Sequence, residues 1–207
     1  MVEITPQIQQ IIDFALIEDQ VFNDPTTKAL ISSNDCGVGV LRAKSSGLLA
    51  GIDVALTVFR RIDASIDALA LINDGHRVVR GSNLAKVSGK VATILRGERT
   101  ALNFLQRMSG IATETARYVK AVEGCHAQIV DTRKTVPGHR YLDKYAVTVG
   151  GGRNHRMHLG DGVLIKDNHI DILQRRGMDL SKVLKQAMER APHTLKIEVE
   201  VTNLDEL

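Results

Sequence analysis

The chain has 207 residues, a formal net charge of +3, 25% charged and 43% hydrophobic residues, the composition of an ordinary globular protein with room for a sizeable core. No apolar run approaches the roughly 20 residues that span a bilayer, and the acidic N-terminus lacks the basic region of a secretory signal, so we expect a cytoplasmic protein with no membrane partner. Three Tyr, four Phe and no Trp offer few surfaces for base stacking, which disfavours a nucleic-acid partner.

The chain begins with the pattern of a helix start. Thr5 and Pro6 are the residue types of an N-cap and a first helical position. An apolar stripe follows at helical spacing, formed by Ile8, Ile11, Ile12 and Ala15. Residues 23–27 (NDPTT) have the composition of a turn and are expected to end this helical region.

Short strands and one helix are expected next. Residues 36–43 (CGVGVLRA) predict a strand that starts at a tight bend, and Gly37-Val38-Gly39 indicates a turn, because the third glycine of a dinucleotide fingerprint is missing. The stretch from Leu48 has helical spacing, and residues 76–80 and 86–88 predict strands. We therefore expect a small N-terminal mixed α/β domain, with its connecting helix, over residues 1–105.

The pattern is helical over residues 91–122. One face is formed before an expected break at Ser109-Gly110, and a second face after it. Arg99 lies near the start of this segment. Cys36 and Cys125 have neither metal nor redox spacing, so we expect two free thiols.

Strands and helices alternate in the rest of the chain. Strands are predicted over residues 127–131, 163–166 and 195–201, with centres about 35 residues apart, and helices with apolar stripes lie between them. This alternation predicts a parallel α/β barrel over residues 106–207, with functional groups at the carboxyl ends of its strands. Three such units are too few to close a barrel of about eight strands. Asn203 and Glu206 have the spacing of a capping box at a helix start. We therefore expect an incomplete barrel, truncated at its C-terminal side.

Basic residues gather in residues 131–169, which hold seven Lys or Arg and four His. They form pairs, Arg133-Lys134, His139-Arg140 and His155-Arg156, separated by apolar segments and a glycine triplet. This spacing favours a pocket for a small, multiply charged anion over a solvated face or a nucleic-acid tail. Arginine supplies a planar fork for carboxylate or phosphate oxygens, and lysine supplies a point charge.

The segment TRKTVPGHRYLDKYAVTVGGGRNHR, followed by LIKDNH, resembles the active-site region of the quinolinate phosphoribosyltransferase family, and GERTALNFLQRMSGIAT resembles the same family upstream. The resemblance implies transfer of a phosphoribosyl group from phosphoribosyl pyrophosphate to quinolinate. Decarboxylation would then give nicotinate mononucleotide, pyrophosphate and carbon dioxide, a step toward NAD. It also implies Mg²⁺, bound with phosphoribosyl pyrophosphate, as cofactor. The residues Asn23-Asp24 depart from the Gly-Asp that the family usually shows in this turn.

The resemblance also implies roles for individual residues. Catalytic roles fall to Lys134, Lys166 and Glu200, and Glu200 would also lie near the magnesium pyrophosphate. The substrate-binding set comprises Arg99, Thr132, Arg133, Lys134, His155, Arg156, Lys166, Glu198 and Glu200. Arg99 would reach across from the neighbouring subunit of a homodimer or higher homo-oligomer. Further acidic and glycine-rich segments of the family pattern would follow Leu207.

Two interpretations of the residues stay open beside this one. Glu198 and Glu200 lie two apart on a predicted strand and share a face, where they either meet a cation, hydroxyl or metal, or lie on a solvated edge. The basic set would also suit a related phosphoribosyltransferase with another ring acid, or a non-catalytic anion-binding fragment. Zinc at His155 and His158 is disfavoured, because no third ligand converges on them and Arg156 lies between them.

Overall fold

The computed structural model describes residues 2–207. The chain forms two compact units, the first ending at His155 and the second beginning at Arg156. The predicted domain boundary between residues 105 and 106 falls inside the long helix α4 (Val91–Ala121). The two compact units divide the chain at a different place, between residues 155 and 156. The boundary at 105/106 stays a prediction. Among the described residues, no helix combines the length and the apolar character needed to cross a membrane.

The first unit opens with the predicted helix, α1 (Pro6–Glu18). The Thr5 hydroxyl accepts a hydrogen bond from the Ile8 backbone N–H at 3.4 Å, which satisfies one of the free donors at the helix start. The segment 23–27 does not end the helical region, contrary to expectation. After a short 3₁₀ turn, η1 (Val21–Asn23), Asp24 caps a second helix, α2 (Pro25–Leu30), by accepting from the Thr27 N–H at 3.0 Å.

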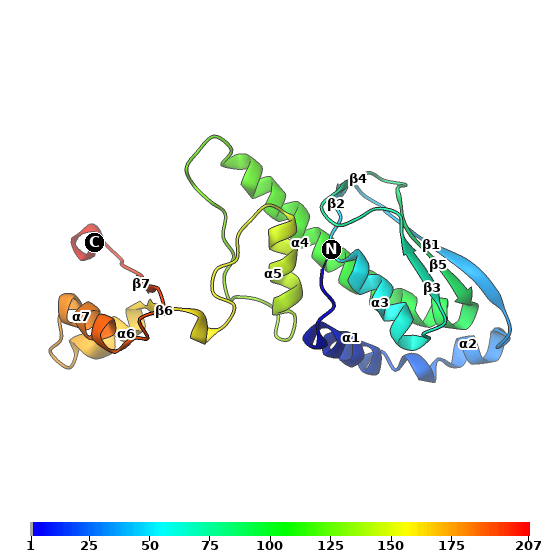
Figure 1. The fold of residues 1–207 in the computed structure, drawn as a ribbon, viewed down its shortest axis with the longest axis horizontal. Coiled ribbons are helices and arrows are strands. Elements are labelled where there is room, and N and C mark those ends of the chain that lie inside the picture. The colour runs from blue at the N-terminus through cyan, green and yellow to red at the C-terminus, as the bar shows by residue number, and fades with distance from the viewer. Residues whose placement is uncertain (1) are drawn as a thin grey trace. The chain divides into compact units, whose positions relative to one another are not determined.

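A three-stranded antiparallel sheet in the order β1-β5-β3 follows, from β1 (Cys36–Arg42), β5 (Asn83–Lys90) and β3 (Asp67–Ala70) (Figure 1). A separate pair joins β2 (Gly47–Leu48) to β4 (Arg77–Val78). The predicted strand over residues 76–80 is therefore only two residues long, and the one over 86–88 is a part of β5. Strand β3, with sequence DALA, was not predicted, because it carries no β-branched or aromatic residue.

The glycines of β1 allow helix α4 to approach the sheet. A Cβ atom at Gly37 would lie 3.1 Å from Val91 Cγ2, and one at Gly39 would lie 3.0 Å from Ile94 Cγ2. Both distances are shorter than ordinary van der Waals contact. The turn predicted at Gly37-Val38-Gly39 is therefore wrong: these residues lie inside a strand, and their lack of side chains serves packing.

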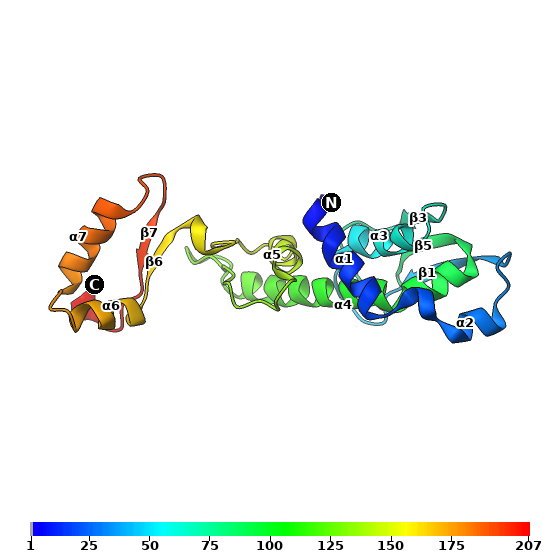
Figure 2. The same ribbon diagram turned by 90° about the horizontal axis from the view of Figure 1, so that it is seen from below.

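Helices α3 (Ile52–Ile62) and α5 (Arg140–Val149) both pack on α4, and Figure 2 shows both next to it. The predicted stripe Ile52, Ala55 and Phe59 is buried in the core of this unit. Burying one side chain of the size of phenylalanine contributes about 1.5–3 kcal/mol. The same core takes in Leu142 and Ala146 from α5, as their helical spacing predicted.

Helix α4 is continuous, so the predicted break at Ser109-Gly110 is wrong. The Ser109 hydroxyl accepts from the Ala50 N–H at 3.1 Å and donates to the Ala50 carbonyl at 3.2 Å. One turn later, the Thr113 hydroxyl accepts from the Leu48 N–H at 2.8 Å. These polar residues interrupt the apolar pattern because they bind a neighbouring loop, while the helix runs on.

The second unit is a strand–helix–helix–strand unit. Strands β6 (Val163–Ile165) and β7 (Ile197–Val199) lie within the predicted strands and are parallel, as predicted; in their pairing, Val163 lies opposite Ile197. Between them lie α6 (Asp167–Gln174) and α7 (Leu180–Arg190). A small core forms from Ile165, Ile170 and Val183, with partly buried neighbours around it. The 3₁₀ turns η2 (Leu159–Asp161) and η3 (Leu204–Glu206) flank the strands.

Two expectations for this half of the chain are corrected. Residues 127–131 do not form a strand, because Val130 makes only an isolated parallel bridge to Arg153, and a single bridge is too short to hold an extended ladder. The cap expected at Asn203 is present, with Asn203 Oδ1 accepting from the Glu206 N–H at 3.1 Å. It begins the 3₁₀ turn η3, not an α-helix.

Two glycines of α4 predict opposite effects of the same substitution. A Cβ at Gly97 would lie 2.6 Å from Cδ1 of the buried Phe59, and such overpacking costs about 1–3 kcal/mol. At Gly110 a Cβ would meet no atom of the described residues within 4 Å, so alanine should gain up to about 1 kcal/mol of helix propensity. Urea unfolding should therefore show Gly97→Ala to be destabilised and Gly110→Ala to be stabilised. Equal stability of the two variants would contradict the close contact of α3 with α4.

Candidate active site

The first group of predicted site residues, Thr132, Arg133 and Lys134, lies in the loop that follows the bridge between Val130 and Arg153. The Lys134 N–H donates to the Thr132 hydroxyl at 3.0 Å, and the Thr135 N–H donates to the Arg133 carbonyl at 3.0 Å, so the loop is tightly turned. Thr132 and Lys134 are exposed. Arg133 is half-buried, and its Nε has no acceptor among the described residues. A buried guanidinium donor without a partner is suited to an anionic ligand.

His155 is held close to this loop by the side chain of Asp131. Asp131 Oδ1 accepts from the His155 backbone N–H at 2.8 Å and also pairs with Lys144 Nζ. Lys144 Nζ donates in addition to the His155 carbonyl at 3.2 Å. The structure thus brings the segment before Thr132 and the segment at His155 together.

Asn154 completes this arrangement. Its amide orientation is assigned from its hydrogen-bond partners: the amide nitrogen donates to Asp131 Oδ2 at 2.8 Å and to the Lys144 carbonyl at 2.9 Å. Both carboxylate oxygens of Asp131 are therefore occupied by donors. The side chains of Lys144 and Asp131 are 1% and 8% exposed, so this is a buried ion pair whose polar atoms are satisfied.

Helix α5 is fastened by the residues on either side of Lys144. Asp143 makes a two-pronged ion pair with Arg107 of α4, both contacts at 2.7 Å, and hydrogen bonding to Asp143 raises the pKa of the Arg107 guanidinium. The Tyr145 hydroxyl donates to Asp74 Oδ2 at 2.8 Å. Burial, and then this hydrogen bond, raise the pKa of Tyr145.

In the second unit, the ends of the two parallel strands bring Lys166 and Glu200 together. Lys166 follows β6, and Glu200 follows β7 by one residue, with its N–H donating to the Ile165 carbonyl at 2.9 Å. Their side chains form an ion pair at 3.4 Å and are 42% and 52% exposed. A pair this exposed contributes only about 0–1 kcal/mol to stability. It is therefore available to a ligand at little cost to the fold.

Glu198 and Arg156 are engaged differently. Glu198, within β7, forms an ion pair with Lys196 at 3.3 Å. The Arg156 guanidinium donates from Nη1 to the Gly162 carbonyl at 2.9 Å, while its Nε is buried without an acceptor among the described residues. The remaining predicted residue, Arg99, is exposed on α4 of the first unit.

Asp131, Lys144 and Asn154 were not among the predicted site residues. Asp131 ended a predicted strand directly before Thr132, at the carboxyl end where functional groups were expected, and this was a usable signal. Lys144 had none, because a lysine beside the apolar stripe of a helix is usually solvated. Only the folded chain shows that its charge is buried.

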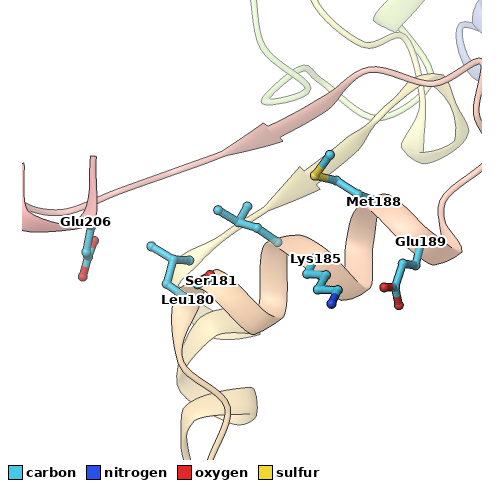
Figure 3. Close-up of a pocket in the computed structure, with 7 residues that line it drawn as sticks. Leu180, Ser181, Lys185, Met188, Glu189 and Glu206 are labelled. Carbon is cyan, nitrogen blue, oxygen red and sulfur yellow. The ribbon is translucent and has the colours of Figure 1, made fainter.

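An open groove of about 680 Å³ lies along α7 and contains none of the predicted site residues (Figure 3). Figure 3 shows Lys185 and Glu189 on one side of α7 and Met188 on the other. The groove is lined by Leu180, Ser181, Leu184, Lys185, Met188, Glu189 and Glu206. This lining has one cation, Lys185, together with two carboxylates, Glu189 and Glu206, and so does not suit a multiply charged acid.

The fold and these side chains define an α/β protein with cations and carboxylates placed at the ends of parallel strands. The family model described as quinolinate phosphoribosyl transferase, N-terminal domain, matches residues 24–109, and its C-terminal counterpart matches residues 111–207. The chain belongs to the quinolinate phosphoribosyltransferase family. The resemblance identified from the sequence is confirmed.

Relatives of this chain occur in bacteria and plants. It is 36% identical, over 97% of its length, to the probable carboxylating nicotinate-nucleotide pyrophosphorylase of Bacillus subtilis, of which it covers 68%. It is 42% identical to the corresponding protein of Mycobacterium leprae, with 93% of this chain and 67% of that protein covered. A mitochondrial quinolinate phosphoribosyltransferase of Nicotiana tabacum is 40% identical over 98% of this chain and 57% of its own. The chain thus spans roughly half to two thirds of the length of these relatives.

Solved structures agree on the fold. The NadC structure from Streptococcus pyogenes superposes with a TM-score of 0.92 at 40% identity, covering 100% of this chain and 72% of its own. The nicotinate-nucleotide pyrophosphorylase of Francisella tularensis gives a TM-score of 0.88 at 35% identity, with 98% and 70% covered. The predicted α/β class with a small N-terminal domain is confirmed.

The partly buried carboxyl group of Asp53, in the first turn of α3, gives a pH-dependent test of the charges at this helix end. Burial, and then the neighbouring charge of Asp74, raise its pKa above the usual 3.8, and its Oδ2 is buried without a partner among the described residues. Because the folded state favours the protonated form of Asp53, ionisation of this group lowers the free energy of unfolding. Full stability is present below the unfolded-state pKa and is lost as the pH rises through the folded-state pKa. Asp53→Asn, which is neutral throughout, should therefore raise the melting temperature at pH 7 and give no gain near pH 3.

Asp63→Asn is the matched control within the same unit. Hydrogen bonds from Ser65 lower the pKa of Asp63, so its charged form stabilises the fold above the unfolded pKa. Its substitution should lower the melting temperature at pH 7, the opposite sign to Asp53→Asn. Thermal unfolding of both variants between pH 3 and pH 8 measures this. A gain for Asp53→Asn that is the same at every pH would contradict the charge argument.

Proposed function

We propose that the protein transfers the phosphoribosyl group of phosphoribosyl pyrophosphate to quinolinate, with decarboxylation, and so produces nicotinate mononucleotide, pyrophosphate and carbon dioxide. The observation that carries this proposal is the match of both family models over most of the chain. The relatives named above carry the same activity in their names. The matched residues also include every member of the predicted substrate set.

The charge of the substrates explains why so many cations are needed. Quinolinate has two adjacent carboxylates, and phosphoribosyl pyrophosphate is more negative still. On the family resemblance, we assign Arg133, Lys134, His155, Arg156 and Lys166 to quinolinate binding. The buried, unpartnered Nε atoms of Arg133 and Arg156 support this assignment, because a dicarboxylate would supply acceptors for them. Thr132 offers a hydroxyl from the same loop.

The reaction needs electrostatic stabilisation but no covalent nucleophile. The pyridine nitrogen attacks C1 of the ribose as pyrophosphate leaves, and positive charge develops on the sugar in the transition state. Glu200 is assigned to that charge, because its carboxylate is exposed at the strand end and exchanges a weak ion pair for the ligand. Glu198 is the second carboxylate of the strand and is assigned to the ribose side.

Decarboxylation follows from the adduct itself. The ring nitrogen is then cationic and stabilises the electron pair left on the adjacent ring carbon when its carboxylate leaves as carbon dioxide. A proton from solvent then bonds to that carbon and completes nicotinate mononucleotide. Lys134 and Lys166 are assigned to hold that carboxylate as a point charge holds an anion, which orients the bond that breaks. Removal of the charge on either lysine would therefore affect the chemical steps as well as binding.

Magnesium is assigned to the substrate, not to a cage built by the protein. Within residues 2–207, no group of three or more His, Cys, Asp or Glu side chains is placed to hold a metal ion. Mg²⁺ prefers oxygen ligands and commonly binds through substrate phosphates and one or two carboxylates. It would enter with phosphoribosyl pyrophosphate and neutralise the leaving pyrophosphate, with Glu200 as the nearby carboxylate.

We also assign the protein to the cytoplasm and to a homodimer with shared active sites. Cys36 and Cys125 are free and exposed, as expected for a reducing compartment. Arg99 is exposed on α4, as expected for a residue that would contribute to the site of a neighbouring subunit.

Turnover of quinolinate tests the proposed function directly. Incubation with quinolinate, phosphoribosyl pyrophosphate and Mg²⁺ should release carbon dioxide and nicotinate mononucleotide. Lys134→Ala should lower the rate by about 10²–10³-fold, the typical effect of removing one electrostatic contact to a reacting group. Lys44→Ala, an exposed lysine of a turn, is the control and should leave the rate unchanged.

Binding distinguishes the remaining outcomes of this assay. One outcome is that the protein binds quinolinate without turning it over, and that Lys134→Ala weakens this binding. This result would place the acid pocket in this chain and the missing part of catalysis outside it. If the protein shows no turnover and binds no quinolinate, the proposed function is overturned for these 207 residues.

Mixing two inactive variants tests the shared site. If Arg99 acts in the partner's site, an Arg99→Ala subunit and a Lys134→Ala subunit together form one intact site per mixed dimer. Random mixing should then recover about a quarter of the wild-type rate. Lys134→Ala mixed with Lys166→Ala is the control, because both residues belong to one subunit's site and no intact site can form. Equal recovery in the two mixtures would exclude an Arg99 contribution across the interface.

A further inference from the structure

Two segments that carry assigned substrate residues are joined by one buried ion pair. Thr132 to Lys134 directly follow Asp131, and Asp131 is bonded to the backbone of His155, 24 residues further along the chain. Regular secondary structure joins the two segments only weakly. The isolated bridge at Val130 and Arg153 rests on two hydrogen bonds, from Asp131 N–H to the Arg153 carbonyl at 3.1 Å and from Arg153 N–H to the Ile129 carbonyl at 2.9 Å.

The Asp131 side chain extends this short bridge toward the site. Beyond the bridge, its Oδ1 takes the His155 N–H and its Oδ2 takes the Asn154 amide, both at 2.8 Å. Lys144 Nζ lies between the Asp131 carboxylate and the His155 carbonyl and donates to both. The donors and acceptors are thus matched, and the groups bound at His155 are its main-chain N–H and carbonyl.

Burial prevents Lys144 from exchanging Asp131 for water. Exposed ion pairs exchange partners with water, whereas the side chain of Lys144 is 1% exposed and can leave Asp131 only by losing the one counter-charge that it has among the described residues. A buried ion pair is weak support for stability, because an apolar pair of the same shape often does as well. What an apolar pair cannot do is orient the His155 N–H and carbonyl at the same time.

We propose that Asp131 and Lys144 are positioning residues for quinolinate binding. Through the main chain, they hold the Thr132–Lys134 loop and His155 at one fixed separation. Neither side chain touches the substrate. The inference rests on the proposed function for the identity of the ligand, but the ordering of the two segments is a property of the protein alone. Because substrate contacts displaced by about 1 Å can cost on the order of 10²-fold in rate, such an anchor is functionally significant.

The test compares Lys144→Met and Asp131→Asn with Asp143→Asn. Lys144→Met keeps the length of the side chain and removes its charge and donors. Asp131→Asn keeps an acceptor for the His155 N–H and remains informative if Lys144→Met does not fold. Asp143→Asn is the matched control: it also breaks a buried carboxylate's ion pair on α5, but the partner is Arg107 of α4, away from both segments.

Hydrogen exchange measured by mass spectrometry is the readout that needs no ligand. In Lys144→Met and Asp131→Asn, the amides of residues 131–135 and 152–156 should exchange at least about 10-fold faster, while those of α1 and α3 stay protected. Asp143→Asn should leave these two segments protected. Uniformly faster exchange over the whole first unit, or no change at residues 131–135 and 152–156, would overturn the proposal by showing a purely structural role or none.

Quinolinate titration is the second readout. The Kd for quinolinate should rise about 10- to 100-fold in both anchor variants and stay at the wild-type value in Asp143→Asn. A folded Lys144→Met protein with wild-type affinity would overturn the proposal. If the unsubstituted protein binds no quinolinate, the proposed function fails instead, and the exchange experiment alone decides whether the two segments are anchored.

Discussion

The buried ammonium group of Lys144 is the charge around which the loop after residue 130 and the segment at residue 155 are arranged. A cation with a 1% exposed side chain has left water and must recover that loss from fixed partners. Asp131 and the His155 carbonyl supply them, so the folded state is defined only when α5, the loop after residue 130 and the segment at residue 155 meet. Many alternative arrangements of these loops would leave a buried charge unpaired, and they are excluded for this reason.

Helix α5 owes this central position to three consecutive residues. Successive side chains on an α-helix point about 100° apart, so Asp143, Lys144 and Tyr145 reach three different parts of the unit. They bind Arg107 on α4, Asp131 before the loop, and Asp74, which also accepts from the Gly51 and Ile52 N–H groups at the start of α3. A short helix therefore links the core to the loop that carries the assigned substrate residues.

The second unit is built on a different balance. Its core contains only three buried residues, and the charged pair at its strand ends is exposed. Parallel strands place their carboxyl ends on one edge, which brings Lys166 and Glu200 together without any special packing. The first unit thus orders the residues assigned to the substrate by a buried network, whereas the second brings Lys166 and Glu200 together by strand direction and leaves their charges accessible.

The family, the α/β class, the helices with clear apolar stripes, and the parallel strands within residues 163–166 and 195–201 were predictable from the sequence alone. These features rest on periodicity, capping residues and long matched motifs, which are local in the chain. The tertiary structure decided three points that the sequence analysis missed or had wrong: α4 continues through Ser109-Gly110, residues 127–131 are not a strand, and Lys144 is buried. Each depends on a partner far along the chain, Ala50, Arg153 and Asp131 respectively. A lysine beside an apolar stripe has the same local pattern whether solvent or a carboxylate receives its charge, so only the fold distinguishes the two.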